Sequence, residues 1–238
     1  NHIEKNFVKN IDETILEVIF DTKYYHLIRK KGSITVDGVS LTVAELNNDN
    51  FTVNLIPHTF NNTILKYESI GNVVNLEFDN YIPKWGKNDY MNYAIELSEK
   101  DKGYTLPNPW VGAVITNTKG EILATGYHKE FGKEHAEINA LNYLKKKLNN
   151  NEINNTELIL YCTLEPCSHV GKTGSCALQL LNYNFKEINI GIKDPNPLVS
   201  GKGIEILENK FIVNVGIQKE LVNESLKEYI YYYKNKTP

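Results

Sequence analysis

Residues 1–83 alternate between apolar and polar positions in short runs, with the period of two that β-strands show. Polar turns such as Asp37-Gly38 separate the runs. Residues 21–31 interrupt them with a pattern that we interpret as a helix. Short strands between turns predict an antiparallel β-barrel or sandwich. The expected strands span residues 15–20, 33–36, 40–46, 51–56 and 73–78.

The pattern changes at residues 83–87, and helical and strand-like segments alternate from Asp89 onward. Apolar residues at helical spacing predict one helix capped by Asp89, one that starts near His135, and a last amphipathic helix over residues 220–233. Such alternation is typical of an α/β layer sandwich. The other expected elements are strands at residues 111–116, 121–127, 158–163, 187–192 and 211–215 and a helix at residues 177–181.

Composition then narrows the class of protein. A chain of 238 residues that is 41% hydrophobic and 23% charged is typical of soluble globular proteins and has room for two domains. The net charge of −3 does not suit a nucleic-acid binder, and no apolar run approaches the roughly 18 residues of a membrane helix. With three cysteines and no secretory signal, we expect a cytoplasmic protein that binds metal rather than forming disulfides. Because the chain begins with Asn1, we leave open that it is part of a longer protein.

Four residues carry the candidate chemistry: His135, Glu137, Cys167 and Cys176. One imidazole and two thiolates can bind Zn²⁺ and leave a fourth position for water, and a carboxylate can move protons between that water and a leaving amine. Glycines between the two cysteines predict a loop that brings the thiols together. We therefore predict one zinc ion per chain, bound by the imidazole and both thiols, with Glu137 as the catalytic proton shuttle. Cys162 is expected to be a buried thiol, while a structural zinc knot that uses it, or no metal at all, stays open.

These motifs resemble the zinc deaminase superfamily, although eight residues separate Cys167 from Cys176 where that superfamily usually has two. The longer loop is similar to that of one branch, the pyrimidine deaminase of riboflavin biosynthesis, which is the deaminase half of the bifunctional deaminase–reductase. Gly174-Ser175 stands where this family usually has two prolines. The resemblance covers residues 88–233. The further segments that carry it are residues 107–112, 126–128, 194–199 and 201–203.

The resemblance implies hydrolytic deamination of 2,5-diamino-6-ribosylamino-4(3H)-pyrimidinone 5′-phosphate to the 5-amino-6-ribosylamino-uracil phosphate, in which water replaces the 2-amino group. It also implies which residues bind the substrate and its ribose phosphate arm. These are Asn108, His128, Ser168, His169, Lys172, Asp194 and Asn196. No NADP is expected, because the reductase half of the family is missing.

The strand-rich segment resembles the C-terminal, lumazine-binding barrel of riboflavin synthase, on residues 31–43 and 54–59. By this analogy a lumazine pocket is lined by Ser40, Thr42, Ile56 and Thr59. Riboflavin synthase has two barrels, whereas this chain has one that runs directly into the deaminase segment. The barrel domain is therefore incomplete, and riboflavin synthase activity is left open.

We therefore expect an α+β multidomain protein. An antiparallel, riboflavin synthase-like β-barrel over residues 1–86 is followed by a three-layer α/β/α cytidine-deaminase-like sandwich with a mixed sheet over residues 87–238. The expected function is zinc-dependent pyrimidine deamination in riboflavin biosynthesis, by a homo-oligomer that binds neither nucleic acid nor membranes. Two alternatives stay open: a fragment of a bifunctional riboflavin synthase/deaminase, and a lumazine- or flavin-binding module with an inactive deaminase.

Overall fold

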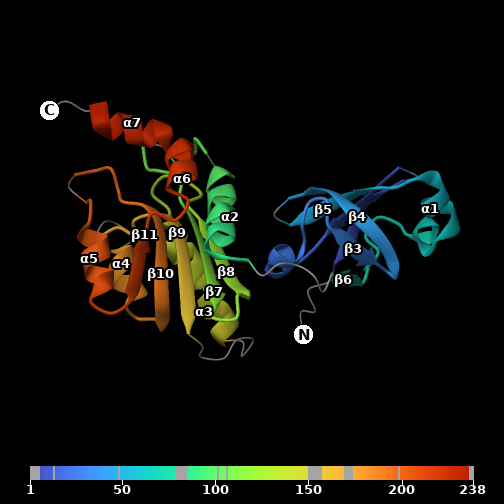
Figure 1. Cartoon of the computed structure of the whole chain (residues 1–238), viewed down its shortest axis with the longest axis horizontal. Coiled ribbons are helices and arrows are strands. Elements are labelled where there is room, and N and C mark those ends of the chain that lie inside the picture. The colour runs from blue at the N-terminus through green and yellow to red at the C-terminus, as the bar shows by residue number, and fades with distance from the viewer. Residues whose placement is uncertain are drawn as a thin grey trace. The chain divides into compact units, whose positions relative to one another are not determined.

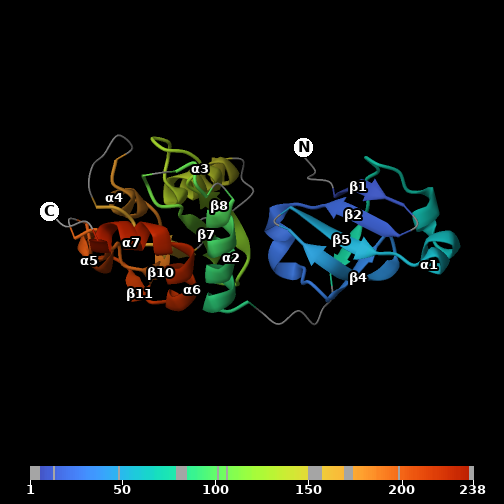
Figure 2. The ribbon, with the colours of Figure 1, turned by 90° about the horizontal axis from the view of Figure 1, so that it is seen from above.

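The computed structural model divides the chain into two compact units, Asn1–Lys84 and Trp85–Pro238 (Figures 1 and 2). Its description covers residues 6–12, 14–47, 49–78, 85–100, 102–105, 107–149, 157–168, 174–197 and 199–235.

The first unit is a six-stranded antiparallel sheet. Its strands are β1 (Phe7–Ile11), β2 (Ile15–Ile19), β3 (Ser33–Val36), β4 (Val39–Leu46), β5 (Asn50–Asn54) and β6 (Leu76–Phe78). They pair in the order β1-β2-β5-β4-β3-β6. On β4, Leu41 and Val43 are buried while Ser40 and Thr42 are exposed, as the two-residue period of a half-buried strand requires.

Backbone hydrogen bonds also join β1 to the segment that leads into β6, the strand at the other end of the order. The Val8 N–H donates to the Asn72 carbonyl at 2.9 Å, and the Val74 N–H donates to the Asn6 carbonyl at 3.0 Å. Phe7 and Val73 form an isolated antiparallel bridge between the same segments. These bonds satisfy backbone groups that would otherwise lie on an open sheet edge.

The helix expected over residues 21–31 is wrong in type and length, because this segment forms a shorter 3₁₀ helix, η1 (Thr22–Leu27). Lys31 has a positive φ of 65° and donates its N–H to the Val43 carbonyl, and the Val43 N–H donates to the Gly32 carbonyl. The sheet therefore uses backbone groups that a longer helix would need.

Three short elements of the first unit were not expected from the sequence pattern. They are β1, helix α1 (Pro57–Asn62) and the 3₁₀ helix η2 (Ile64–Tyr67). The strand expected over residues 73–78 is also shorter, since only Leu76–Phe78 pair with β3. Elements of three to six residues give too few positions for a hydrophobic period to be recognised.

The second unit contains a five-stranded mixed sheet. Its strands are β7 (Gly112–Asn117), β8 (Ile122–Tyr127), β9 (Leu158–Leu164), β10 (Phe185–Ile192) and β11 (Ile212–Val215). The order is β11-β10-β9-β7-β8. β9, β10 and β11 run parallel, whereas β7 is antiparallel to both of its neighbours.

Helices cover both faces of this sheet (Figure 1). They are α2 (Lys87–Glu99), α3 (Ala136–Asn149), α4 (Cys176–Leu180), α5 (Lys202–Glu208), α6 (Lys219–Ser225) and α7 (Lys227–Asn235). α2 contacts β7 and α6, whereas α3 contacts β8, β7 and α4. A Cβ on Gly112 would lie 1.8 Å from the Ala94 carbonyl oxygen of α2, and a Cβ on Gly126 would lie 2.2 Å from the Ala136 carbonyl oxygen of α3. Because Gly126 pairs with Ala113, the neighbour of Gly112, the two glycines face opposite sides, and α2 and α3 form separate layers.

Helix ends in the second unit differ in detail from the expectations. α2 starts at Lys87, and Asp89 is not its cap but its third residue, whose carboxylate accepts a hydrogen bond from the Gly86 N–H at 2.8 Å. The helix expected over residues 220–233 is two helices, α6 and α7, with a break at Leu226. Among the described residues, no helix has the length and apolar character needed to cross a membrane.

Candidate active site

Four segments meet at the side of the second sheet where β9 and β10 end, which we call the active-site edge. The strand directions bring them there. The parallel strands β9 and β10 both end there, which places Cys167 and Asp194 just beyond the same edge. β7 is antiparallel to β9, so its beginning, after Asn108, lies at this edge too. β8 is antiparallel to β7, so its end, followed by His128, completes the group. The carboxyl ends of neighbouring parallel strands are where open α/β sheets usually bind ligands.

The start of α3 places His135 and Glu137 at this edge. The Asn139 amide donates to the Tyr127 carbonyl at 2.9 Å and to the Glu134 carbonyl at 3.1 Å, which fixes the first turn of α3 to the end of β8. The absence of a side chain at Gly126 allows the helix backbone to approach the strand closely. His135 and Glu137 therefore project from a rigidly anchored helix start.

Hydrogen bonds between Cys167 and the residues at the start of α4 hold the two cysteines together. The Ser175 hydroxyl donates to the Cys167 carbonyl at 2.9 Å and accepts from the Leu178 N–H at 3.2 Å, so that it caps α4. The Ala177 N–H donates to the same Cys167 carbonyl at 3.1 Å. The Cys176 N–H donates to the Cys167 sulfur at 3.4 Å. The fold-back that the glycines predicted is thus fixed by the cap of α4.

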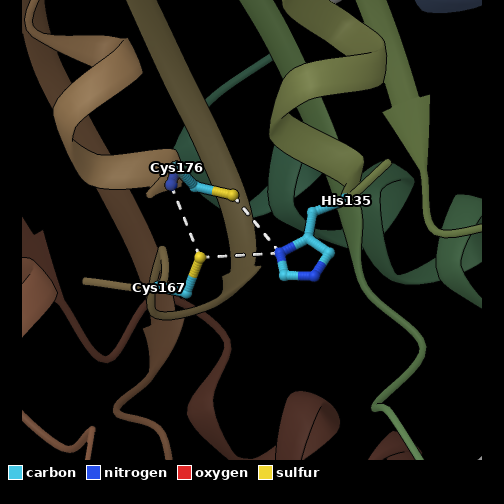
Figure 3. A group of neighbouring side chains, drawn as sticks. All are labelled: His135, Cys167 and Cys176. Carbon is cyan, nitrogen blue, oxygen red and sulfur yellow. Dashed lines mark hydrogen bonds between the residues drawn. The ribbon is translucent and has the colours of Figure 1, made fainter. Parts of the chain in front are cut away.

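His135, Cys167 and Cys176 form a compact cluster (Figure 3). The His135 Nδ1 lies 3.6 Å from the Cys167 Sγ and 3.3 Å from the Cys176 Sγ, and all three ligand atoms lie within 4.8 Å of one another. A tetrahedral zinc ion with Zn–S of about 2.3 Å and Zn–N of about 2.0 Å would separate its nitrogen and sulfur ligands by about 3.5 Å. The distances and the donor set therefore fit zinc with one position left open.

The two thiols are electrostatically coupled. Hydrogen bonds from the Cys176 thiol and, to a smaller extent, from the His135 ring lower the pKa of Cys167 to about 4. The same hydrogen bond raises the pKa of Cys176. The hydrogen bond with Cys167 also raises the pKa of His135. Cys162, by contrast, lies outside this cluster in β9, and burial raises the pKa of its thiol well above the usual value.

Glu137 is a buried carboxylate next to the cluster, with 3% of its surface exposed. Burial raises the pKa of the Glu137 carboxyl to about 7, and the nearby His135 ring opposes that rise. A carboxyl with a pKa near neutrality can both accept and donate a proton at physiological pH, which suits general acid–base chemistry.

His128 and Asn108 form a second polar pair at the same edge. The His128 Nδ1 lies 3.0 Å from the Glu134 carbonyl oxygen, which can only accept, so Nδ1 carries the proton. The His128 Nε2 is then an acceptor and lies 3.5 Å from the Asn108 amide nitrogen. Burial lowers the pKa of His128, which keeps the ring neutral. The His128 ring is edge-on to that of His135, with centroids 5.3 Å apart.

These groups line one cavity of about 350 Å³, which is large enough for a small-molecule substrate. Seven of the residues selected from the sequence lie on its wall: Asn108, His128, His135, Glu137, Cys167, Asp194 and Asn196. Cys176 is fully buried behind the wall, and Ser168 is half-buried next to Cys167. His169 and Lys172 lie outside the described residues.

The residues selected for a lumazine pocket belong to the first unit. Ser40 and Thr42 are exposed on β4, Ile56 is 62% exposed before α1, and Thr59 is half-buried in α1. The structure therefore does not bury any of the four fully, and their role stays a prediction.

Sequence reasoning missed Glu165, which organises one side of the cavity. This buried carboxylate accepts hydrogen bonds from the backbone N–H groups of Asp194, Gly201 and Gly203 at 3.1, 2.9 and 2.9 Å. It thereby holds the loop after β10 and the start of α5 against the end of β9. An acidic residue directly after the apolar run at Leu158–Leu164 was the available signal.

Four wall residues with no assigned role were also missed. They are Phe131 and Lys133, in the loop before α3, and Tyr229 and Tyr233, on α7. Among the described residues of the wall, Lys133 is the only lysine. The available signal for Tyr229 and Tyr233 was their spacing of four residues in an amphipathic helix. Aromatic residues at this spacing usually indicate core packing.

Family comparisons agree with this geometry. Residues 86–192 match the cytidine and deoxycytidylate deaminase zinc-binding region, and residues 2–79 match the lumazine binding domain. The mixed sheet and the His-Cys-Cys cluster with a neighbouring glutamate thus define a zinc-dependent deaminase domain of the cytidine and deoxycytidylate type.

Individual relatives narrow the family. The diaminohydroxyphosphoribosylamino-pyrimidine deaminase of Buchnera aphidicola subsp. Schizaphis graminum is 42% identical over 132 residues, which are 55% of this chain and 84% of that protein. The chain belongs to this deaminase family, which acts in riboflavin biosynthesis. The riboflavin biosynthesis protein RibD of Aquifex aeolicus is 40% identical over 151 residues, or 63% of this chain. The match covers 40% of the length of that relative.

Solved structures support the same fold. The Thermotoga maritima diaminohydroxyphosphoribosylaminopyrimidine deaminase/5-amino-6-(5-phosphoribosylamino)uracil reductase is 38% identical with a TM-score of 0.58, and the match covers 64% of this chain and 42% of that chain. Acinetobacter baumannii RibD is 33% identical with a TM-score of 0.58, and the match covers 64% of this chain and 41% of that chain.

Proposed function

We propose that the second unit hydrolyses the 2-amino group of 2,5-diamino-6-ribosylamino-4(3H)-pyrimidinone 5′-phosphate and releases ammonia. The observation that carries the proposal is the position of Glu137, a buried carboxylate on the wall of the cavity that also contains the His135 and Cys167 ligand atoms. A proton-transfer group beside an N,S,S metal cluster suits hydrolysis of an amidine-like carbon.

Different residues have different roles in the proposed reaction. His135, Cys167 and Cys176 would hold zinc, which supplies a Lewis acid that makes water more acidic. The Glu137 carboxylate accepts a proton from the attacking water and then donates it to the departing amine.

Polar wall residues orient the substrate. Asn108 and the neutral His128 offer an amide and a ring nitrogen to the pyrimidine, and Asp194 and Asn196 offer polar atoms to the ribosylamino arm. Ser168, His169 and Lys172 follow from the family resemblance as further contacts, with Lys172 as the phosphate partner. The names of the Buchnera and Thermotoga relatives, which include this deaminase activity, support the assignment.

Ammonia release by the purified, zinc-loaded chain tests the proposal. Glu137→Gln should keep its zinc and lose turnover by roughly 10²–10⁴-fold, because the proton shuttle is removed while the ligands stay. Glu134→Gln is the matched control, since Glu134 is an exposed carboxylate three residues earlier and should leave turnover unchanged. Full activity in the Glu137 variant would refute the assigned role.

A second candidate function belongs to the first unit, because residues 2–79 match the lumazine binding domain. This unit would close into a barrel through the bonds between β1 and the segment before β6, and would bind a lumazine or flavin near Ser40, Thr42, Ile56 and Thr59. Riboflavin synthase activity would require the first units of different chains to associate. A homo-oligomer would bring these units together.

Fluorescence titration of the full chain with a lumazine tests this second function. Replacing Ser40 and Thr42 together with valine should weaken binding, whereas Ser69→Ala, at an exposed position outside the predicted pocket, should not. Sedimentation in the same buffer measures the oligomeric state, and a riboflavin assay measures synthase activity. Tight lumazine binding without ammonia release would favour a binding module over a deaminase.

A further inference from the structure

Helix α7 is fixed to the active-site edge from two directions. The buried Trp110 lies two residues after Asn108, and its indole N–H donates to the Ser225 carbonyl at 3.1 Å, at the junction of α6 and α7. The Ser225 hydroxyl donates to the Glu99 carboxylate of α2. These bonds hold the first turn of α7 beside the beginning of β7.

Tyr229 then connects α7 to Asp194. Its side chain is only 9% exposed, and its hydroxyl donates to the Asp194 Oδ1 at 3.3 Å. Burial raises the pKa of Tyr229, so the hydroxyl keeps the proton that it donates. The Tyr233 ring, one helical turn later, packs against Tyr229 with centroids 5.0 Å apart at an interplanar angle of 66°. Both rings line the cavity that contains Glu137.

The hydrogen bonds to Asp194 leave one carboxylate oxygen for a ligand. Oδ1 accepts from the Asn196 N–H at 2.8 Å as well as from the Tyr229 hydroxyl. The Asp194 backbone is fixed by its N–H bond to Glu165 at 3.1 Å. Neither of these two bonds uses Oδ2, and Asp194 lines the cavity. An oxygen of a cavity-lining carboxylate that these bonds do not use can accept a hydrogen bond from a ligand donor.

We propose that α7 is a specificity-determining wall of the substrate site, in which Tyr229 positions Asp194 so that Oδ2 accepts a hydrogen bond from the ribosylamino arm of the substrate, and the Tyr233 ring packs against that arm. The inference rests on the proposed deaminase function and names which part of the substrate this wall recognises. Glu137 and the candidate metal ligands come from the start of α3, the residues after β9 and the start of α4, so the reacting amine and the arm are recognised by different elements.

Two substrates distinguish recognition of the arm from a general structural effect. The zinc-loaded full chain is assayed for ammonia release with the phosphorylated ribosylamino substrate and with the free triaminopyrimidinone base, which lacks the arm. Tyr229→Phe should raise the KM of the full substrate about five- to tenfold, because Asp194 loses the hydrogen bond that positions it, and should leave kcat within about twofold. The kcat/KM of the free base should not change.

Matched variants on the same helix control for stability. Tyr231→Phe removes a hydroxyl from a residue that is 69% exposed and should leave both substrates unaffected. Tyr233→Ala should raise the KM of the full substrate, because it removes the ring that packs against the arm. Zinc content and the unfolding midpoint of each variant identify one that fails to fold.

The outcomes separate the two proposals. If the wild type releases ammonia and Tyr229→Phe has an unchanged KM, or affects both substrates equally, the inference about α7 is overturned. If the wild type releases none, the proposed function fails. Calorimetric titration of the wild type and the Tyr229 variant with the same phosphorylated compound then still tests the wall, and equal affinities overturn it.

Discussion

The two units differ in what they bury. Among the described residues of the first unit, Asn50 is the only polar or charged residue classed with the buried interior, which otherwise consists of apolar side chains such as Phe51 and Val53. The second unit buries Glu137, Glu165 and Asp194 at one sheet edge. Burial of carboxylates is unfavourable unless hydrogen bonds or bound ligands compensate. The second unit therefore concentrates buried carboxylates at the sheet edge that carries the candidate chemistry, and no Asp or Glu is among the buried residues described for the first unit.

The largest expected effect is the loss of one zinc ligand. Cys176→Ser should remove the bound zinc and lower ammonia release by at least about 10³-fold, because the cluster then has two good ligands instead of three. Metal analysis by mass spectrometry checks the stoichiometry. Cys162→Ala, which removes a buried thiol outside the cluster, is the control and should keep one zinc per chain. Zinc loss in the control instead would favour the four-ligand knot.

Truncation of one core side chain in the first unit tests whether ammonia release depends on the second unit alone. Phe51 is fully buried, and Phe51→Ala should destabilise the first unit by about 3–5 kcal/mol. Hydrogen exchange of β2, β4 and β5 should accelerate, while ammonia release per bound zinc should not change, because every described residue of the cavity wall belongs to the second unit. Thr52→Ala, at a half-buried position on the same strand, is the milder control. A loss of turnover in Phe51→Ala with zinc retained would contradict the assignment of ammonia release to the second unit alone.

Glu165 allows a smaller test of the buried carboxylates. Glu165→Gln replaces an acceptor of several backbone N–H groups by an amide that can accept at only one oxygen, and should cost about 2–3 kcal/mol of unfolding free energy. Both tryptophans lie in the second unit, so urea unfolding followed by tryptophan fluorescence reports on this unit. Glu157→Gln, which removes one member of an exposed ion pair with Lys186, should change little. Equal midpoints for both variants would contradict a structural role for Glu165.

The smallest expected effect concerns an exposed carboxylate of the first unit. Asp12 accepts hydrogen bonds from the Thr14 hydroxyl, the Thr14 N–H and the Ile15 N–H, which lower its pKa. A lowered pKa in the folded state means that the carboxylate stabilises the turn above its usual pKa and loses this effect as the pH falls through the lowered value. Asp12→Ala should therefore speed hydrogen exchange of β2 at pH 7, with a ratio to the wild type that shrinks towards pH 3. A constant ratio would show that charge is unimportant there.

Long elements and chemically distinctive residues could be predicted from the sequence. The hydrophobic period placed β8, β9 and α3 within a few residues, and the unusual combination of one histidine and two cysteines identified the cluster. The elements that were predicted wrongly are short or depend on contacts between residues that are far apart in the chain. The helix over residues 21–31 gave way to backbone pairing with β4, and the break at Leu226 follows from anchors on Trp110 and α2 rather than from any local signal.

The wall residues show the same limit. Glu165 and Tyr229 act through partners 29 to 39 and 35 positions away in sequence, so no local motif reveals them. By contrast, His135 and Glu137 lie two positions apart in the chain and could be recognised as a motif. Sequence reasoning therefore found the candidate metal ligands and the candidate proton-transfer group, and missed the residues that shape the cavity around them.

The position of α7 also sets an order of events during synthesis. Chains are made from the N-terminus and fold as their segments emerge. His135, Cys167 and Cys176 all leave the ribosome before Tyr229 and Tyr233, so the metal cluster can assemble while one side of the cavity is still open to solvent. The side of the cavity wall that Tyr229 and Tyr233 provide is thus added only after every residue of the metal cluster has been synthesised.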